Sequence, residues 1–188
     1  MKTLSDTGEL LIIEKIKRLL TNGKNVKTGL GDDCAVVSPG PGNKFDLLLT
    51  SDPVIEGTHF KRGTNPAKIG HKAAGRVLSD IAAMGGTPLW ILVNIEAPKS
   101  CPVITIEKIF TGINSLAEKF SVSVIGGDLC SGEKLSVHTF AVGQTPRGKA
   151  ILRSGAKQGD IIFVTGSLGG SRIKEKHLTF EPRVREGA

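Results

Sequence analysis

Aspartates stand beside glycine or serine at four well-separated places in this 188-residue sequence. A lone aspartate in such a setting is usually a turn or capping residue, so a structural role is the default explanation for each one taken alone. The repetition of one local design favours a shared site instead. The aspartates concerned are Asp32-Asp33, Asp52, Asp80 and Asp128.

Carboxylates that converge from separate elements point to metal-assisted phosphate chemistry. They cannot all stay ionised in one place unless cations bind or their pKa values rise. Carboxylate oxygens are hard ligands that suit Mg²⁺, which also shares the oxygens of bound phosphates. The reaction that matches best is phosphoryl transfer, in which metal ions neutralise charge on the migrating group. We expect Asp52 and Asp128 at the ends of apolar strands, and Asp80 late in a helix at the margin of its apolar stripe.

Several common catalytic and nucleotide-binding signatures are absent. The sequence has no Gly-x-x-x-x-Gly-Lys-Ser/Thr, which excludes a P-loop enzyme, and no Gly-x-Gly-x-x-Gly, which excludes a Rossmann site. No serine or cysteine arrangement supports covalent catalysis. Of the four histidines, His59 lies close to a candidate site, downstream of Asp52, whereas His138 falls within an expected strand and is expected to be structural.

The composition argues against nucleic-acid, membrane and disulfide-rich classes. The net formal charge is +7, but the basic residues are dispersed and aromatic residues make up only 4%. We therefore expect a solvated basic surface, with an anionic small ligand such as a phosphate ester as the alternative, and no nucleic-acid partner. No apolar run approaches the roughly 20 residues of a membrane helix, and the N-terminus does not resemble a signal peptide. The three cysteines form no Cys-x-x-Cys pair, so we expect a reduced, cytoplasmic setting.

Hydrophobic periodicity predicts an α+β fold. Strands joined by short turns and only two long helices favour a mixed, largely antiparallel sheet with both helices packed on one face. The 24 glycines, about twice the average share, indicate many tight turns and close backbone approaches. The predicted helices are 8–20, 66–84 and 104–120, and the predicted strands are 34–38, 45–51, 89–96, 122–125, 134–143 and 161–165.

Six short motifs in order resemble one known family. They are Leu30-Gly-Asp-Asp-Cys-Ala-Val-Val37, Thr50-Ser-Asp-Pro-Val-Ile-Glu-Gly-Thr-His-Phe60, Leu78-Ser-Asp-Ile-Ala-Ala-Met-Gly85, Ile125-Gly-Gly-Asp128, Leu152-Arg-Ser-Gly-Ala-Lys-Gln-Gly-Asp160 and Val164-Thr-Gly-Ser-Leu-Gly169. Each is weak alone, but together they are similar to the thiamine-monophosphate kinase family, within the aminoimidazole ribonucleotide synthetase-like superfamily. The resemblance extends from about Gly8 to Gly187.

The resemblance implies ATP-dependent phosphorylation of thiamine monophosphate to the diphosphate, by direct in-line transfer with several Mg²⁺ ions. It further implies a homodimer joined through sheet edges. Residues 1–150 would form an N-terminal ATP- and Mg²⁺-binding, dimerising domain, and residues 151–188 a linker and the start of a C-terminal α/β domain. By position, the implied metal ligands are Asp33, Thr50, Ser51, Asp52, Asp80 and Asp128; the implied substrate contact is His59; and the implied ATP contacts are Gly127, Asp128 and Arg153.

The sequence also departs from the family. Two motifs of the family's second half, Asp-Leu-Ser-Asp-Gly-Leu and Gly-Gly-Glu-Asp-Tyr, are missing, so we expect this chain to represent the first part of a two-domain protein. Two alternatives stay open. One is another ATP-using enzyme of the superfamily, of the purine-synthetase or hydrogenase-maturation type. The other is a non-catalytic nucleotide-binding module.

Overall fold

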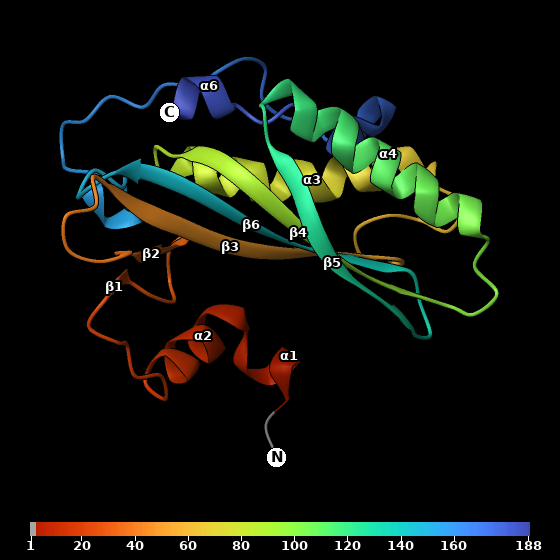
Figure 1. The fold of residues 1–188 in the computed structure, drawn as a ribbon, viewed down its shortest axis with the longest axis horizontal. Helices are drawn as coiled ribbons and strands as arrows, with labels where there is room; N and C mark the ends of the chain where they lie inside the picture. Colours follow the sequence, from red (N-terminus) through yellow and green to blue (C-terminus); the bar gives the residue numbers. More distant parts are fainter. Residues whose placement is uncertain (1–2) are drawn as a thin grey trace.

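A computed structural model describes residues 3–188, and its centre is one six-stranded sheet (Figure 1). The strand order is β1-β2-β3-β6-β4-β5. All neighbours are antiparallel except β4 and β5, which are parallel and joined by a helix. The strands are β1 (Val26–Thr28), β2 (Ala35–Val37), β3 (Phe45–Ile55), β4 (Thr87–Ala97), β5 (Ser123–Ser131) and β6 (Ser136–Pro146). The predicted α+β class with a mixed, mostly antiparallel sheet is confirmed.

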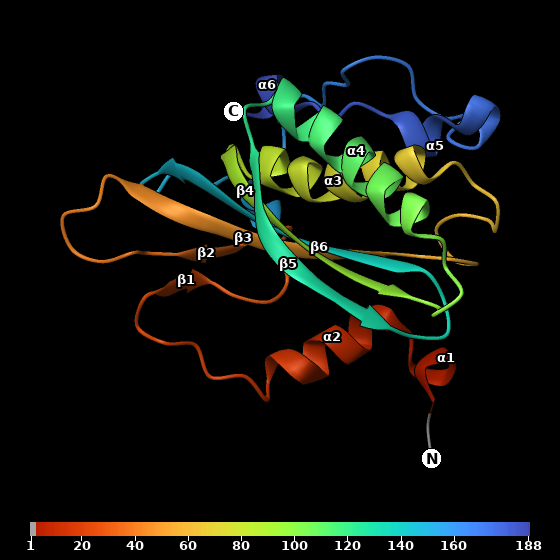
Figure 2. The same cartoon turned by 45° about the vertical axis from the view of Figure 1, so that its right-hand side comes forward.

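Two long helices, α3 (Pro66–Ala83) and α4 (Val103–Lys119), cover one face of the sheet side by side (Figures 1 and 2). Asn65 caps α3 by accepting a hydrogen bond from the Ala67 N–H at 2.9 Å, and Pro66 occupies the first turn. The helices approach each other at backbone distance, because a Cβ on Gly70 would overlap the Ile109 carbonyl. The expectation of two long helices on one face is therefore confirmed.

The hydrophobic core lies between these helices and the sheet. Ile81 on α3, Ile113 on α4 and Ile91 on β4 are fully buried there. Strand side chains alternate between faces, so the other face carries the remaining residues of each strand. That open face exposes 44% of Trp90 and leaves His138 exposed.

The N-terminal helices lie on the open side of the sheet, away from α3 and α4 (Figures 1 and 2). They are α1 (Leu4–Thr7) and α2 (Glu9–Lys17), and neither has a buried residue. The helix predicted over 8–20 is thus present but shorter. Its apolar residues are largely exposed, Leu10 by 79% and Leu11 by 62%.

Two strands extend further than their apolar runs, and this corrects the expected positions of Asp52 and Asp128. Asp52 lies inside β3 and Asp128 inside β5, not at strand ends. Strand β3 continues because β6 pairs with it along its whole length, and β5 continues because β4 pairs with it through Asp128. Pairing partners, rather than hydrophobicity, decide where these strands end.

The strand predicted over 161–165 is wrong. No strand is assigned there, and the side chains of Ile161, Ile162 and Phe163 are at least 77% exposed. An apolar run becomes a strand only when another strand supplies its hydrogen bonds, and none is present beside this segment. Two short helices follow it, α5 (Lys176–Thr179) and α6 (Val184–Gly187), and both contact α3. No helix among residues 3–188 is long and apolar enough to cross a membrane.

Candidate functional site

Helix α3 carries a row of charged residues on the face that meets β3 and the loop after it. Lys72, Arg76 and Asp80 are spaced by four, so they share one side of the helix. Asp80 Oδ2 accepts a hydrogen bond from Thr50 Oγ1 at 2.8 Å. Lys72 Nζ donates to the His59 carbonyl oxygen at 2.8 Å. The charge of the row therefore changes from negative at Asp80, beside β3, to positive at Lys72, beside the loop that follows β3.

Asp33, Asp52 and Asp80 form what we call the acidic cluster. Burial, helped by the charges of Asp52 and Asp33, raises the pKa of Asp80 to about 6, although the Thr50 hydrogen bond and the charge of Arg76 act to lower it. The hydrogen bond from Thr50 therefore does not fully compensate the negative charge of ionised Asp80. A bound cation would favour that ionised form.

Two arginines pair with the other carboxylates of the acidic cluster. Arg76 holds Asp52 in a two-point pair, Nε to Oδ2 at 2.7 Å and Nη2 to Oδ1 at 2.8 Å. Arg153 forms a salt bridge with Asp33, and its backbone N–H donates to Asp32 Oδ2 at 3.2 Å. Arg153 and Asp33, which are 120 residues apart, are thereby brought into direct contact.

The donor set of the acidic cluster fits Mg²⁺. Carboxylates and the Thr50 hydroxyl are oxygen ligands of the kind this ion prefers. Within residues 3–188, however, no three His, Cys, Asp or Glu side chains are arranged so that they could hold one metal ion. The salt bridges give a reason, because Arg76 and Arg153 occupy the carboxylate oxygens that a metal would need.

The remaining expected ligands lie on the opposite face of the sheet. Asp128 pairs in register with Asn94, which pairs with His138, and all three are exposed on the open face. Together with Ser51 they line a shallow hollow of about 580 Å³. The six expected metal ligands are therefore divided by the sheet: Asp33, Thr50, Asp52 and Asp80 lie on the helix side, and Ser51 and Asp128 on the open side.

Gly127 allows β5 to pass unusually close to β4. Its φ is +151°, and a Cβ there would overlap the Val93 carbonyl. The glycine therefore brings backbone, not a side chain, to the rim of the open-face hollow. His138 lines the same hollow, although we expected a structural residue at that position.

His59 is held in the loop after β3. Its Nδ1 accepts the Ile55 N–H at 3.0 Å, so the ring proton of the neutral imidazole resides on Nε2. Burial lowers the pKa of His59, and the nearby charges of Arg76 and Lys72 lower it further. His59 is thus a neutral imidazole at pH 7, tied by its carbonyl to the charged row on α3.

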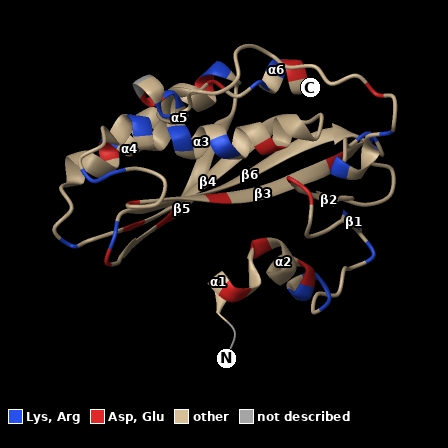
Figure 3. Cartoon of the chain, turned by 180° about the vertical axis from the view of Figure 1, so that it is seen from behind, with Lys and Arg blue, Asp and Glu red and all other residues tan. Residues whose placement is uncertain are grey.

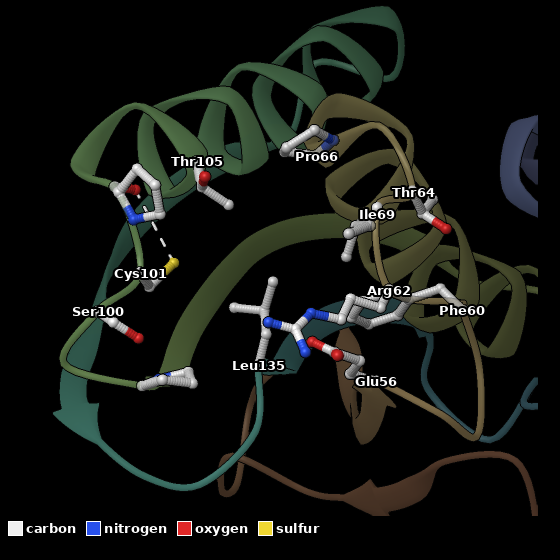
Figure 4. A pocket seen from close by; sticks show the side chains of 13 residues that line it. Glu56, Phe60, Arg62, Thr64, Pro66, Ile69, Ser100, Cys101, Thr105 and Leu135 are labelled. Atoms are coloured by element: carbon white, nitrogen blue, oxygen red, sulfur yellow. Dashed lines mark hydrogen bonds between the residues drawn. The ribbon is translucent and has the colours of Figure 1, made fainter.

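A further pocket lies beyond this loop (Figure 4). It has a volume of about 380 Å³ and is lined on one side by Glu56, Phe60 and Arg62, and on the other by Cys101 and Thr105 at the start of α4. It mixes apolar surface with one acidic and one basic side chain.

Sequence reasoning missed Lys72 and Arg76. The signal was present: stepping back from Asp80 by four residues, and by four again, reaches both on the same helix face. This spacing becomes informative only once Asp52 and His59 are known to lie next to that face of the helix.

Comparisons with known proteins agree with the fold and the motifs. The family model described as "AIR synthase related protein, N-terminal domain" matches residues 31–145. A thiamine-monophosphate kinase of Aquifex aeolicus is 36% identical over 183 residues, covering 97% of this chain and 56% of its own length. That of Bacillus subtilis is 37% identical over 165 residues, covering 87% and 50%. The chain thus spans about half the length of the curated relatives it matches.

Solved structures give the same result. A structure described as "AaThiL complexed with AMPPCP and TMP" superposes with a TM-score of 0.89 at 32% identity, over 100% of this chain and 63% of that one. A thiamine monophosphate kinase from Aquifex aeolicus gives 0.76 at 32%, over 97% and 57%. A HypE–HypF complex gives 0.60 at 20%, over 79% and 47%, which shows a shared fold alone. This chain is a homologue of the thiamine-monophosphate kinases and belongs to the AIR synthase related family, through its N-terminal domain.

Proposed function

We propose that this chain is the ATP- and Mg²⁺-binding half of a thiamine-monophosphate kinase. The observation that carries the proposal is the acidic cluster on the helix side of the sheet, where Asp80 has a pKa raised to about 6 directly beside two ion-paired aspartates. Such a cluster suits metal ions that accompany a polyphosphate. The similarity to a structure described as a complex with AMPPCP and TMP supports the choice of substrates.

The proposed roles follow from the contacts. Asp33, Thr50, Asp52 and Asp80 would hold Mg²⁺ on the helix side, and the bound ions would neutralise the charge on the transferring phosphoryl group. Asp52 has to release Arg76, and Asp33 has to release Arg153, before either carboxylate binds a metal ion. Each freed guanidinium then turns to phosphate oxygens, for which its planar fork is well suited. The proposed ATP contact at Arg153 is consistent with this exchange, because its side chain is 64% exposed.

The open face would contribute three further residues to metal and ATP binding: Ser51, Gly127 and Asp128. We propose that this face is completed by a second copy of the chain. Strand β5 is an outer strand of the sheet, and Ile125 and Leu129 on it are 56% and 61% exposed. An apolar outer strand of this kind readily pairs with another chain. A homodimer joined through the sheet edges would cover it.

An ADP-release assay on the full-length protein tests the proposed activity. With thiamine monophosphate, ATP and Mg²⁺ we expect release of ADP that depends on all three. Asp52→Asn and Asp80→Asn are expected to abolish it, whereas Asp160→Asn, an exposed aspartate outside the acidic cluster, should leave it intact. Release with a different superfamily substrate but not with thiamine monophosphate would favour a purine-synthetase or hydrogenase-maturation type. ATP binding without any release would favour the non-catalytic module.

A further inference from the structure

Helix α2 and the turn that continues it carry an apolar stripe that the described part of the chain leaves uncovered. The stripe, which we call the α2 stripe, consists of residues at helical spacing: Ile12, Ile13, Ile16, Leu19 and Leu20. The side chain of Ile16 is 42% exposed, that of Leu19 81% and that of Leu20 56%. A surface helix of a globular protein normally packs such a stripe against a core. The α2 stripe therefore calls for a partner surface.

The C-terminal end of α2 is anchored to its own copy, although the stripe is not. Lys17 Nζ lies beside Gly31, because a Cβ on that glycine would be 3.3 Å away from it. Asn22 lies equally close to Gly29, where a Cβ would be 2.8 Å from Asn22 Oδ1. None of the residues of α2 is buried. The helix is thus an arm that is held at one end and unpacked along its length.

The open face of the sheet is a second uncovered surface on the same side of the molecule as α2 (Figures 1 and 2). It exposes 44% of Trp90, and Ile125 on the outer strand β5 is 56% exposed. The α2 stripe and the open face do not cover each other within one copy, since both leave large apolar side chains exposed. The C-terminal helices α5 and α6 contact α3, on the opposite side of the sheet.

The charges of these two surfaces are complementary. Strands β3 to β6 contain no Lys or Arg, and their open face carries the acidic side chains of Glu96 and Asp128. On α2, Lys15 and Lys17 border the stripe on its two sides. Figure 3 shows the basic residues of α2 on the open side of the sheet. An apolar stripe flanked by lysines suits an apolar face that carries carboxylates and no basic strand residue.

We propose that α2 packs on the open face of a second copy of this chain and that the exchange is reciprocal. A two-fold axis places the arm of each copy on the sheet of the other, so one kind of contact covers both stripes and both open faces. The inference rests on the homodimer proposed above and not on the kinase activity. It goes beyond that homodimer, because joining the sheet edges alone would leave the α2 stripe exposed.

Sedimentation velocity on the full-length protein tests the exchanged arm. Glutamine forms helices well but is polar, so Ile16→Gln combined with Leu19→Gln removes the apolar contact and keeps α2. We expect the dissociation constant of the dimer to rise about tenfold for each side chain, or about hundredfold in the double variant. Leu11→Gln is the matched control: it changes an exposed leucine of the same helix that lies away from the stripe, and the dissociation constant should stay as in wild type.

Photo-cross-linking tests where the α2 stripe packs. With Leu20 replaced by p-benzoylphenylalanine, illumination should give a band of twice the chain mass on a denaturing gel, with the cross-link mapped to β4 or β5. A double variant that dimerises like wild type, or cross-links confined to single chains, would overturn the exchange and leave the homodimer through sheet edges intact. A wild-type protein that stays monomeric would overturn both the exchange and the homodimer. The ADP-release assay judges the kinase activity separately in every case.

Discussion

Replacing Asp80 by asparagine should stabilise the metal-free protein at neutral pH while removing the proposed kinase activity. Burial and the neighbouring aspartates raise the pKa of Asp80 from 3.8 to about 6. Asparagine has nearly the same shape, keeps an acceptor oxygen for the Thr50 hydroxyl and carries no charge at any pH. The variant therefore removes only the unfavourable ionised form.

The magnitude follows from the pKa shift. A raised pKa means that the folded protein holds the Asp80 proton more tightly than the unfolded chain. The group therefore stabilises the fold most below about pH 4, and this stabilisation is lost as the pH rises through about 6. A shift of about two pKa units, at roughly 1.4 kcal/mol per unit, would change the free energy of unfolding by about 3 kcal/mol. Because Asp80 is only partly buried, solvent screening reduces this to about 1–2 kcal/mol.

Urea unfolding in EDTA at pH 4 and pH 7.5 measures the effect. We expect Asp80→Asn to exceed wild type by about 1–2 kcal/mol at pH 7.5 and to match it at pH 4. Glu107→Gln, an exposed carboxylate on α4, serves as a control that should show no such difference. Adding Mg²⁺ should stabilise wild type and leave Asp80→Asn unchanged. A variant less stable than wild type at pH 7.5, or a gain that persists at pH 4, would refute the electrostatic reasoning.

Three further substitutions probe the fold and the site. Gly127→Ala is expected to lower the free energy of unfolding by about 3 kcal/mol or more, because its Cβ would overlap the β4 backbone at a φ of +151°. Gly155→Ala is the control: it has open space around it and should be close to neutral in thermal unfolding. Arg153→Gln should leave the unfolding midpoint nearly unchanged, because the Arg153 side chain is exposed. It should nevertheless weaken ATP binding about tenfold, as measured by calorimetry. Unchanged ATP affinity would contradict the proposed ATP contact at Arg153. Leu129→Lys on the outer strand β5 should convert the proposed homodimer to a monomer in sedimentation velocity, and a variant that stays dimeric like wild type would contradict an interface at β5.

Helix α3 shows why part of the fold could be read from the sequence. Its start is encoded by Asn65 and Pro66, its end by Gly85, and its buried face by a run of apolar residues at helical spacing. All of this information is local, so the predicted and observed bounds agree closely. The strands behaved differently. The ends of β3 and β5 depend on β6 and β4, which are distant in the sequence, and the apolar run at 161–165 has no partner and forms no strand.

For the candidate site, too, one part could be predicted from the sequence and another part depends on tertiary packing. Residue types and their spacing singled out the aspartates and His59 as candidates, because oxygen-ligand chemistry is a property of the chain itself. The resemblance to a known family added Arg153. Only the tertiary structure separated the expected ligands onto two faces, since side chains at adjacent strand positions such as Ser51 and Asp52 point in opposite directions. It also paired Arg76 with Asp52 and Arg153 with Asp33. Such contacts arise from the packing of α3 and the C-terminal segment against the sheet, and no local pattern encodes that packing.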